Sequence, residues 1–136
     1  MIRIMKLSAL FVAAMGCSSV KSFEIDSINY KLSNNSGLCQ LEIPRSNTTI
    51  ALKIPYPCDV HVDKNKSIRI FDNKGQKYII IEHSIPHPVL PGDCQTSLQS
   101  IVITEEHTKA SEYIDVVASC PPYQWDTKVF KGLFRD

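Results

Sequence analysis

The sequence lacks the short motifs that mark nucleotide-binding proteins and the commonest hydrolases. It contains no G-x-x-x-x-G-K-[ST] or G-x-G-x-x-G phosphate-binding loop and no G-x-S-x-G nucleophile elbow. No two cysteines are separated by two residues, which excludes the C-x-x-C pairs of zinc ribbons and thioredoxin-like redox proteins. We therefore expect no enzymatic activity and no metal ion or other cofactor.

Histidine and acidic clusters are also missing. The four histidines are scattered along the chain: His61, His83, His87 and His107. Only His83 and His87 lie close together, and the prolines on either side of His87 disfavour the helical i, i+4 pair that could bind a metal. We expect all four histidines in loops or on the surface. Glu105 and Glu106 are interpreted as part of a solvated loop rather than as a catalytic carboxylate pair.

The chain has almost no excess of positive charge, with a formal net charge of +1. It holds 15 basic and 14 acidic side chains, and three of the basic ones precede the first acidic residue, Glu24. Residues 23–136 therefore carry twelve basic and fourteen acidic side chains. Nucleic-acid binding depends on a concentrated basic face. The densest basic cluster, 64–69, is interleaved with polar residues and is interpreted as a turn, so we expect no nucleic-acid partner.

No apolar run approaches the ~20 residues that a membrane-spanning helix needs. The apolar stretch Leu7–Met15 follows Arg3 and Lys6 and precedes small and polar residues, which is the layout of a secretory signal peptide. Cleavage after Ser22 would give a signal peptide of residues 1–22 and a single domain of residues 23–136. Cleavage before Cys17 would give a shorter leader, residues 1–16.

The second cleavage site resembles a bacterial lipoprotein signal. Gly16-Cys17 matches the last two positions of that pattern, whereas Ala14 and Met15 depart from the usual leucine and small residue. The resemblance implies a lipid on Cys17, and Ser18 beside it favours the outer membrane. Under either cleavage we expect a periplasmic protein, which would contact a membrane only through such an anchor.

Cleavage after Ser22 removes Cys17, and cleavage before Cys17 would use its sulfur for the lipid, so either route leaves four cysteines to pair: Cys39, Cys58, Cys94 and Cys120. An even number of cysteines in an exported domain predicts a disulfide framework, because the compartment oxidises thiols. Four cysteines allow three pairings. We favour Cys39–Cys58 with Cys94–Cys120, because each pair could join neighbouring strands without crossing the chain.

Short segments in which apolar and polar residues alternate predict a mostly β structure. The alternation is clearest in residues 38–43 and 48–54, and residues 79–81 are apolar throughout, which indicates a central strand covered on both faces. In residues 23–32 the alternation slips at Asp26-Ser27, which we interpret as a bulge or kink within one strand. Seven or eight strands favour an all-β fold, a small antiparallel sandwich or barrel.

The tail of the chain can be read in two ways. Trp125, Val129 and Leu133 are spaced at i, i+4 and i+8, which favours a short C-terminal helix capped by Asp126. Gly132 weakens that pattern, and an extended edge strand is the alternative.

Two segments are candidates for binding a protein partner. The first is the proline-rich loop Ser84–Asp93, whose rigid backbone would lose little entropy on docking. Its candidate contact residues are Pro86, His87, Pro88, Val89, Leu90 and Pro91. Alternatively, Ile85 and Leu90 fold inward and close one end of the sandwich. The second is the aromatic pair Tyr123 and Trp125, which would form an interface patch if exposed or part of the core if buried.

In layout the chain resembles small periplasmic proteins that protect bacteria from wall-degrading enzymes, namely bacteriocin immunity proteins and lysozyme inhibitors. The shared features are the leader, a β-rich body of about 115 residues and the paired cysteines. The chain lacks the Ser-Gly-x-x-Tyr element that lysozyme inhibitors use. The resemblance implies a binding protein that neutralises a bacteriocin or a cell-wall hydrolase by occluding it. A structural or assembly lipoprotein of the envelope is the alternative.

Overall fold

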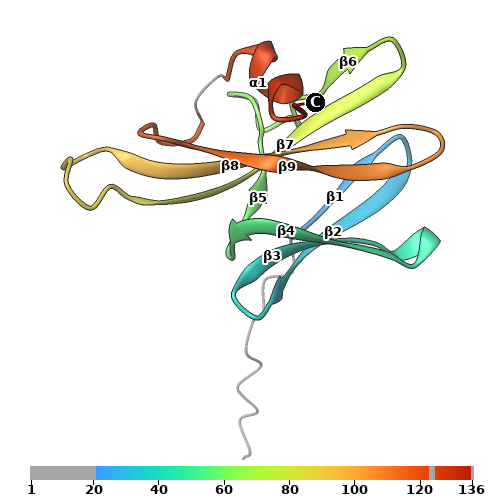
Figure 1. Ribbon diagram of the computed structural model, residues 1–136, viewed down its shortest axis with the longest axis horizontal. Helices are drawn as coiled ribbons and strands as arrows, with labels where there is room; N and C mark the ends of the chain where they lie inside the picture. The colour runs from blue at the N-terminus through green and yellow to red at the C-terminus, as the bar shows by residue number, and fades with distance from the viewer. Residues whose placement is uncertain (1–20, 123–124, 136) are drawn as a thin grey trace, which may run out of the picture.

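Two antiparallel β-sheets face each other in the computed structural model, which describes residues 21–122 and 125–135 (Figure 1). Sheet A has the strand order β1-β2-β3-β4. Its strands are β1 (Lys21–Ile25), β2 (Ile28–Asn35), β3 (Leu38–Ile43) and β4 (Thr48–Pro55). Residues 1–20 of the predicted 1–22 leader, with Cys17, lie outside the described residues, as does Tyr123; the last two leader residues, Lys21 and Ser22, belong to β1.

Sheet B has the order β5-β7-β8-β9, and a short strand β6 also pairs with β7. Its strands are β5 (Asp59–Val60), β6 (Phe71–Asn73), β7 (Gln76–Pro86), β8 (Cys94–Ile103) and β9 (Thr108–Val117). The two sheets confirm the predicted all-β sandwich. β7 is central, as its apolar run Ile79–Ile81 indicated. β7 also extends to Pro86, so the connection to β8 is shorter than the predicted loop and comprises residues 87–93 alone.

The first two strands correct one prediction. The slip at Asp26-Ser27 is a complete chain reversal between β1 and β2 rather than a kink within one strand. Both residues have positive φ angles, 51° and 64°, which is the geometry of a tight two-residue hairpin turn. The Nζ atom of Lys77 in β7 donates to the Asp26 carboxylate, and this hydrogen bond raises the pKa of Lys77. The turn is thereby attached to sheet B.

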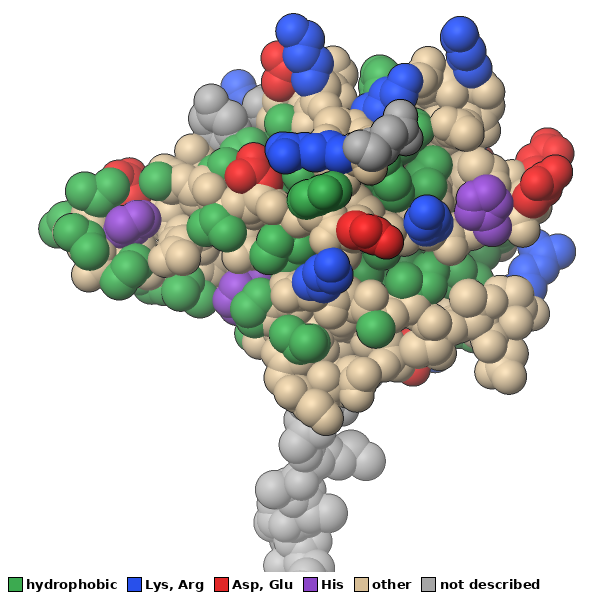
Figure 2. Space-filling view, in the orientation of Figure 1, with side chains coloured by type: hydrophobic (Ala, Val, Ile, Leu, Met, Phe, Trp, Pro, Cys, Tyr) green, Lys and Arg blue, Asp and Glu red, His purple; other side chains and the backbone are tan. Residues whose placement is uncertain are grey.

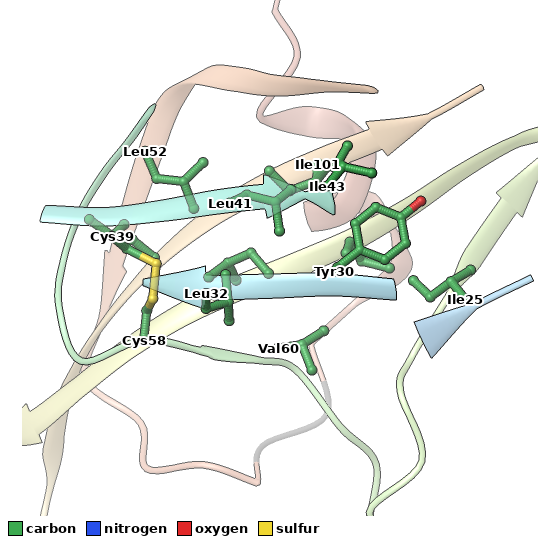
Figure 3. Close-up of a cluster of buried hydrophobic side chains, with 13 residues drawn as sticks. Ile25, Tyr30, Leu32, Cys39, Leu41, Ile43, Leu52, Cys58, Val60 and Ile101 are labelled. Carbon is green, nitrogen blue, oxygen red and sulfur yellow. A yellow bond between two sulfur atoms is a disulfide. The ribbon is translucent and has the colours of Figure 1, made fainter. Parts of the chain in front are cut away.

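The main hydrophobic core lies between the sheets (Figure 3). Alternate residues of β2, β3 and β4 point into it, because side chains along a strand alternate between the two faces. From sheet B, Val60, Ile79, Ile81 and Ile101 complete the core. These side chains are almost fully inaccessible to solvent.

A second core lies on the outer face of sheet B, where the C-terminal segment covers it (Figure 1). The segment contains α1 (Thr127–Gly132), and the Asp126 side chain caps this helix by accepting a hydrogen bond from Lys128 N at 2.9 Å. The predicted helix is confirmed, and the alternative of an edge strand was wrong. The buried members of the second core are Tyr78, Ile80, Leu98, Val102, Trp125, Phe130 and Leu133. No helix in the described part of the chain has the length and apolar character needed to cross a bilayer.

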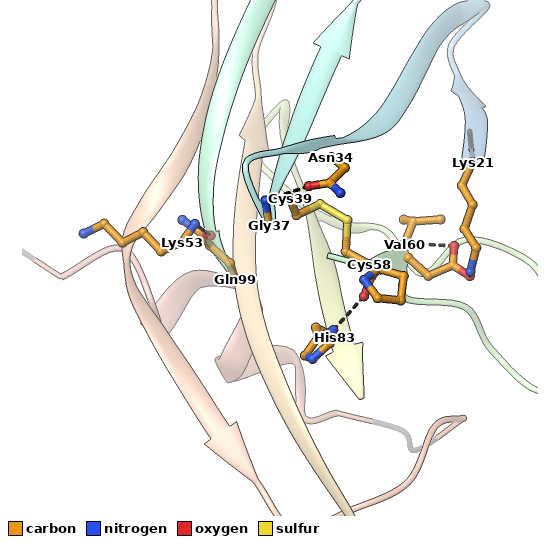
Figure 4. Close-up of a disulfide and its surroundings, with 11 residues drawn as sticks. Lys21, Asn34, Gly37, Cys39, Lys53, Cys58, Val60, His83 and Gln99 are labelled. Atoms are coloured by element: carbon orange, nitrogen blue, oxygen red, sulfur yellow. Dashed lines mark hydrogen bonds and ion pairs between the residues drawn. A yellow bond between two sulfur atoms is a disulfide. The ribbon is translucent and has the colours of Figure 1, made fainter. Parts of the chain in front are cut away.

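The disulfides pair as predicted. Cys39–Cys58 joins β3 to the segment that leads into β5, and both of its residues are buried in the main core (Figure 4). Cys94–Cys120 joins the start of β8 to the chain that follows β9, and its Cys120 end is exposed.

The amide side chain of Gln99 connects the two sheets where the edge strands β4 and β9 lie near each other. The Oε1 atom of Gln99 in β8 accepts from the backbone N–H of Lys53 in β4 at 2.8 Å (Figure 4). Its Nε2 donates to Ser111 O in β9 at 2.7 Å. Lys53 Nζ also donates to the backbone oxygen of Glu112 at 2.7 Å. The bonds to Ser111 O and Glu112 O satisfy backbone oxygens at a bulge in β9, where the pairing register shifts opposite Ser100.

Candidate functional site

Sheet B projects beyond sheet A because its strands are longer. β7, β8 and β9 contain 11, 10 and 10 residues, whereas the strands of sheet A contain between five and eight. At a rise of ~3.3 Å per residue, this difference leaves roughly 10 Å of sheet B without a facing sheet. Figure 1 shows this end of β7 and β8 extending to the left of the molecule.

The uncovered part of sheet B carries large apolar side chains on the face that sheet A covers elsewhere. The register pairs Ile81 with Gln99 and Gln99 with Ile114, so Ile114 lies on the same face as the core residue Ile81. By the same alternation, Ile85 and Val116 also lie on this face. Their exposed fractions are 43% for Ile85, 40% for Ile114 and 49% for Val116. Three large aliphatic side chains, of the kind that fill the core elsewhere, are therefore partly exposed to solvent at this end of sheet B.

The tip of the β7–β8 hairpin continues this apolar surface. Val89 is 77% exposed and Leu90 is 45% exposed, and Figure 2 shows hydrophobic side chains gathered over the projecting end. We call the five residues Ile85, Val89, Leu90, Ile114 and Val116 the distal surface. Exposed apolar patches on small soluble domains commonly mark sites of protein interaction.

Local hydrogen bonds hold the tip in one conformation. His87 Nδ1 accepts from the backbone N–H groups of Val89 and Leu90 at 3.1 and 3.0 Å. His87 N donates to Asp93 O at 2.9 Å, and Gly92 supplies the positive φ of 83° that the turn needs. The hairpin is thus closed across its last residues and is already ordered without a partner.

The base of the hairpin is attached to its surroundings on both faces. His83 Nδ1 lies 2.7 Å from the backbone oxygen of Pro57, which connects β7 to the segment after sheet A (Figure 4). On the other face, Thr96 Oγ1 donates to Ser119 O at 2.6 Å, next to the Cys94–Cys120 disulfide. These attachments limit hinge motion of the projecting hairpin.

The structure separates the two segments that the sequence suggested for partner binding. Pro86, Pro88, Val89, Leu90 and Pro91 are all exposed at the tip, and His87 is half-buried because its ring faces the loop backbone. Ile85 and Leu90 do not fold inward. Trp125, by contrast, lies in the second core and is only 5% exposed, so it does not form an interface patch. Ile114 and Val116 were missed, because their alternating pattern looks the same as that of a buried strand.

A buried polar cluster fastens the C-terminal segment to sheet B. Trp125 Nε1 donates to Glu82 Oε2 at 3.1 Å, and the same oxygen lies 3.3 Å from His61 Nδ1. Arg69 donates to the Trp125 backbone oxygen at 2.7 Å, lies 3.5 Å from His61 Nε2 and covers the ring of Phe130. Charges of both signs are therefore brought together under the segment.

This cluster corrects two predictions. His61 was expected in a loop or on the surface, but it is completely buried between Glu82 and the rings of Trp125 and Phe130. Arg69, which was interpreted as part of a polar turn, points into the molecule. Because His61 is inaccessible, the cluster offers no open position at which a substrate could react, and we interpret it as structural.

The described residues contain no group of three or more histidine, cysteine, aspartate or glutamate side chains placed to hold a metal ion. No protein-family model, curated protein or solved structure matches this chain.

Proposed function

We propose that the domain is an exported binding protein of the bacterial envelope, which neutralises a bacteriocin or a cell-wall hydrolase by occluding its active cleft. The observation that carries this proposal is the distal surface at the end of a rigid, projecting hairpin. A narrow apolar tip fits a concave site, and the exposed side chains would leave water on binding. Two disulfides support an oxidising compartment such as the periplasm.

The mechanism needs no chemical turnover. The tip is ordered before binding by the His87 hydrogen bonds, so docking costs less conformational entropy than it would for a mobile loop. Burying a large aliphatic side chain contributes about 1.5–3 kcal/mol. Val89 and Leu90 would therefore be the main anchors, with Ile85, Ile114 and Val116 widening the contact behind them.

We expect the double variant Val89→Asp/Leu90→Asp to weaken inhibition by about 100-fold or more, because two charged groups would replace the apolar anchors. The measurement is the inhibition constant against a panel of muramidases acting on suspended peptidoglycan. A second measurement is the survival of cells that produce the protein and are exposed to bacteriocins acting in the periplasm.

Ile70→Asp is the matched control. The exposed fraction of Ile70 is 42%, similar to the 45% of Leu90. Ile70 is distant from the hairpin tip, however, because it precedes β6, which pairs with the opposite end of β7. This variant should inhibit like the unchanged protein. Full inhibition by the double variant would refute the occlusion mechanism. If the unchanged protein inhibits no member of either panel, the proposed function itself is wrong.

The second candidate function is a structural or assembly lipoprotein anchored through Cys17. The outer edge of β9 favours it, since β9 is the last strand of sheet B and an edge strand can pair with a strand of another protein. A Cys17→Ser variant distinguishes the two functions. A soluble inhibitor should still protect cells, whereas an assembly subunit should lose its role when it is released from the membrane.

A further inference from the structure

A cavity of about 520 Å³ lies at the end of the sandwich opposite the distal surface. It opens between η1 (Pro44–Ser46), which connects β3 to β4, and the turn between β8 and β9. Figure 1 shows these two connections and the β1–β2 turn converging on the right of the molecule. Its volume falls within the ~300–1,000 Å³ that small-molecule sites usually occupy.

The floor of the cavity is aliphatic. Ile28 and Ile43 contribute from sheet A and Ile103 from sheet B, and Tyr30 lies beside them. Burial raises the pKa of the Tyr30 phenol, and the nearby Asp26 acts in the same direction. Its hydroxyl therefore remains neutral at physiological pH, and the floor carries no charge.

The rim is charged, and its charges are of opposite sign on the two walls. Arg45 belongs to η1 on the sheet A side, whereas Glu105 and Glu106 belong to the β8–β9 turn on the sheet B side. Among the described side chains, no ion pair joins Arg45 to either glutamate. Both charges therefore remain available to a ligand that lies across the opening.

Both walls are ordered. Asn47 closes η1 with an N–H to Pro44 O bond of 3.1 Å. In the β8–β9 turn, Thr104 N donates to His107 O at 2.9 Å, and His107 N donates to Thr104 Oγ1 at 3.1 Å. The cavity is thus formed without a ligand, which lowers the entropic cost of filling it.

We propose that this cavity binds a small zwitterion with an aliphatic body, namely a free aliphatic amino acid or a dipeptide that contains one. The ligand's carboxylate pairs with Arg45, its ammonium group pairs with Glu105 or Glu106, and its side chain lies on the isoleucine floor. This site is separate from the distal surface and independent of the proposed inhibition. Because the rim is open to solvent, the affinity is modest, with a Kd on the order of 0.1–1 mM.

The test is a titration of the disulfide-bonded protein, labelled at its isoleucine methyl groups, with leucine and with leucyl-alanine. We expect saturable NMR shifts at Ile28, Ile43 and Ile103, and no shift at Ile80 in the second core. N-acetyl-leucine lacks the ammonium group and leucinamide lacks the carboxylate, and each should bind at least about fivefold more weakly than leucine.

The variants assign each charge to its partner. Arg45→Gln should bind leucine and leucinamide equally, and Glu105→Gln/Glu106→Gln should bind leucine and N-acetyl-leucine equally. Glu24→Gln, on an exposed position of β1, is the control and should keep both preferences.

Absence of saturation by about 20 mM of either probe, or equal binding of the capped and uncapped ligands by the unchanged protein, would overturn the proposal. Val89→Asp/Leu90→Asp should bind leucine normally, which separates this result from failure of the inhibitor function.

Discussion

Replacing Glu82 by leucine is expected to lower the free energy of unfolding by about 1–3 kcal/mol, the cost of leaving a buried polar group without its hydrogen-bond partner. The carboxylate of Glu82 accepts the Trp125 indole N–H and faces His61 inside the molecule. Without it, the buried indole N–H of Trp125 loses this acceptor, and His61 Nδ1 loses the carboxylate oxygen that lies 3.3 Å away. Since a domain of this size is stable by only ~5–15 kcal/mol, the loss would be a large fraction of the total.

The chain provides its own probe for this experiment. Trp125 is the only tryptophan, so its fluorescence reports on the C-terminal segment, while far-ultraviolet circular dichroism reports on the sheets. In guanidinium, Glu82→Leu should lose the fluorescence signal at a lower concentration than the dichroism signal. Glu82→Gln keeps an oxygen acceptor and should lose less stability, and the exposed Glu24→Leu should change it by under about 0.5 kcal/mol. Coincident, unshifted transitions in Glu82→Leu would show that the cluster does not stabilise the segment.

Removing the Cys39–Cys58 disulfide with alanine at both positions should cost at least about 3 kcal/mol. The bridge closes a chain segment of 19 residues, and the entropy that such a closure removes from the unfolded chain accounts for about this amount. Both cysteines are buried, at 1% and 2% exposure, so alanine also leaves unfilled space in the main core. Thermal unfolding under oxidising conditions measures the effect.

Cys94→Ala/Cys120→Ala is the natural comparison. This bridge closes a segment of 26 residues, so its entropic contribution is similar, but Cys120 is exposed and little core packing is lost. We expect the smaller loss of stability here, and we expect dilute reductant to cleave this bridge first. An equal or larger loss than for Cys39→Ala/Cys58→Ala would contradict the role assigned to core packing.

The sequence predicted the parts of the fold that depend on local pattern. Alternation located the faces of β3 and β4, and the run Ile79–Ile81 identified the central strand, because a strand covered on both sides needs apolar residues at successive positions. The prolines near residues 86–91 hid the full length of β7. The reversal at Asp26-Ser27 was missed because neither residue is the glycine that usually marks such a turn.

The polar cluster and the distal surface could not be predicted from local pattern. His61, Arg69, Glu82 and Trp125 are far apart along the chain and meet only when sheet B and the C-terminal segment pack together. Glu82 did carry a signal, since it continues the face of Tyr78 and Ile80, where a carboxylate needs a partner. Ile114 and Val116 are exposed because the strands of sheet A are shorter than β9 and do not cover them. The sequence of β9 alone contains no information about the length of the strands in the other sheet.

The covering of sheet B by residues 125–134 has a consequence for how the chain is made. Synthesis proceeds from the N-terminus, so all nine strands are complete before the residues that shield Tyr78, Ile80, Leu98 and Val102 emerge. During that interval the apolar outer face of sheet B is exposed to solvent, and association with neighbouring chains competes with native folding. Late truncations should therefore show up first as low yield and insoluble product.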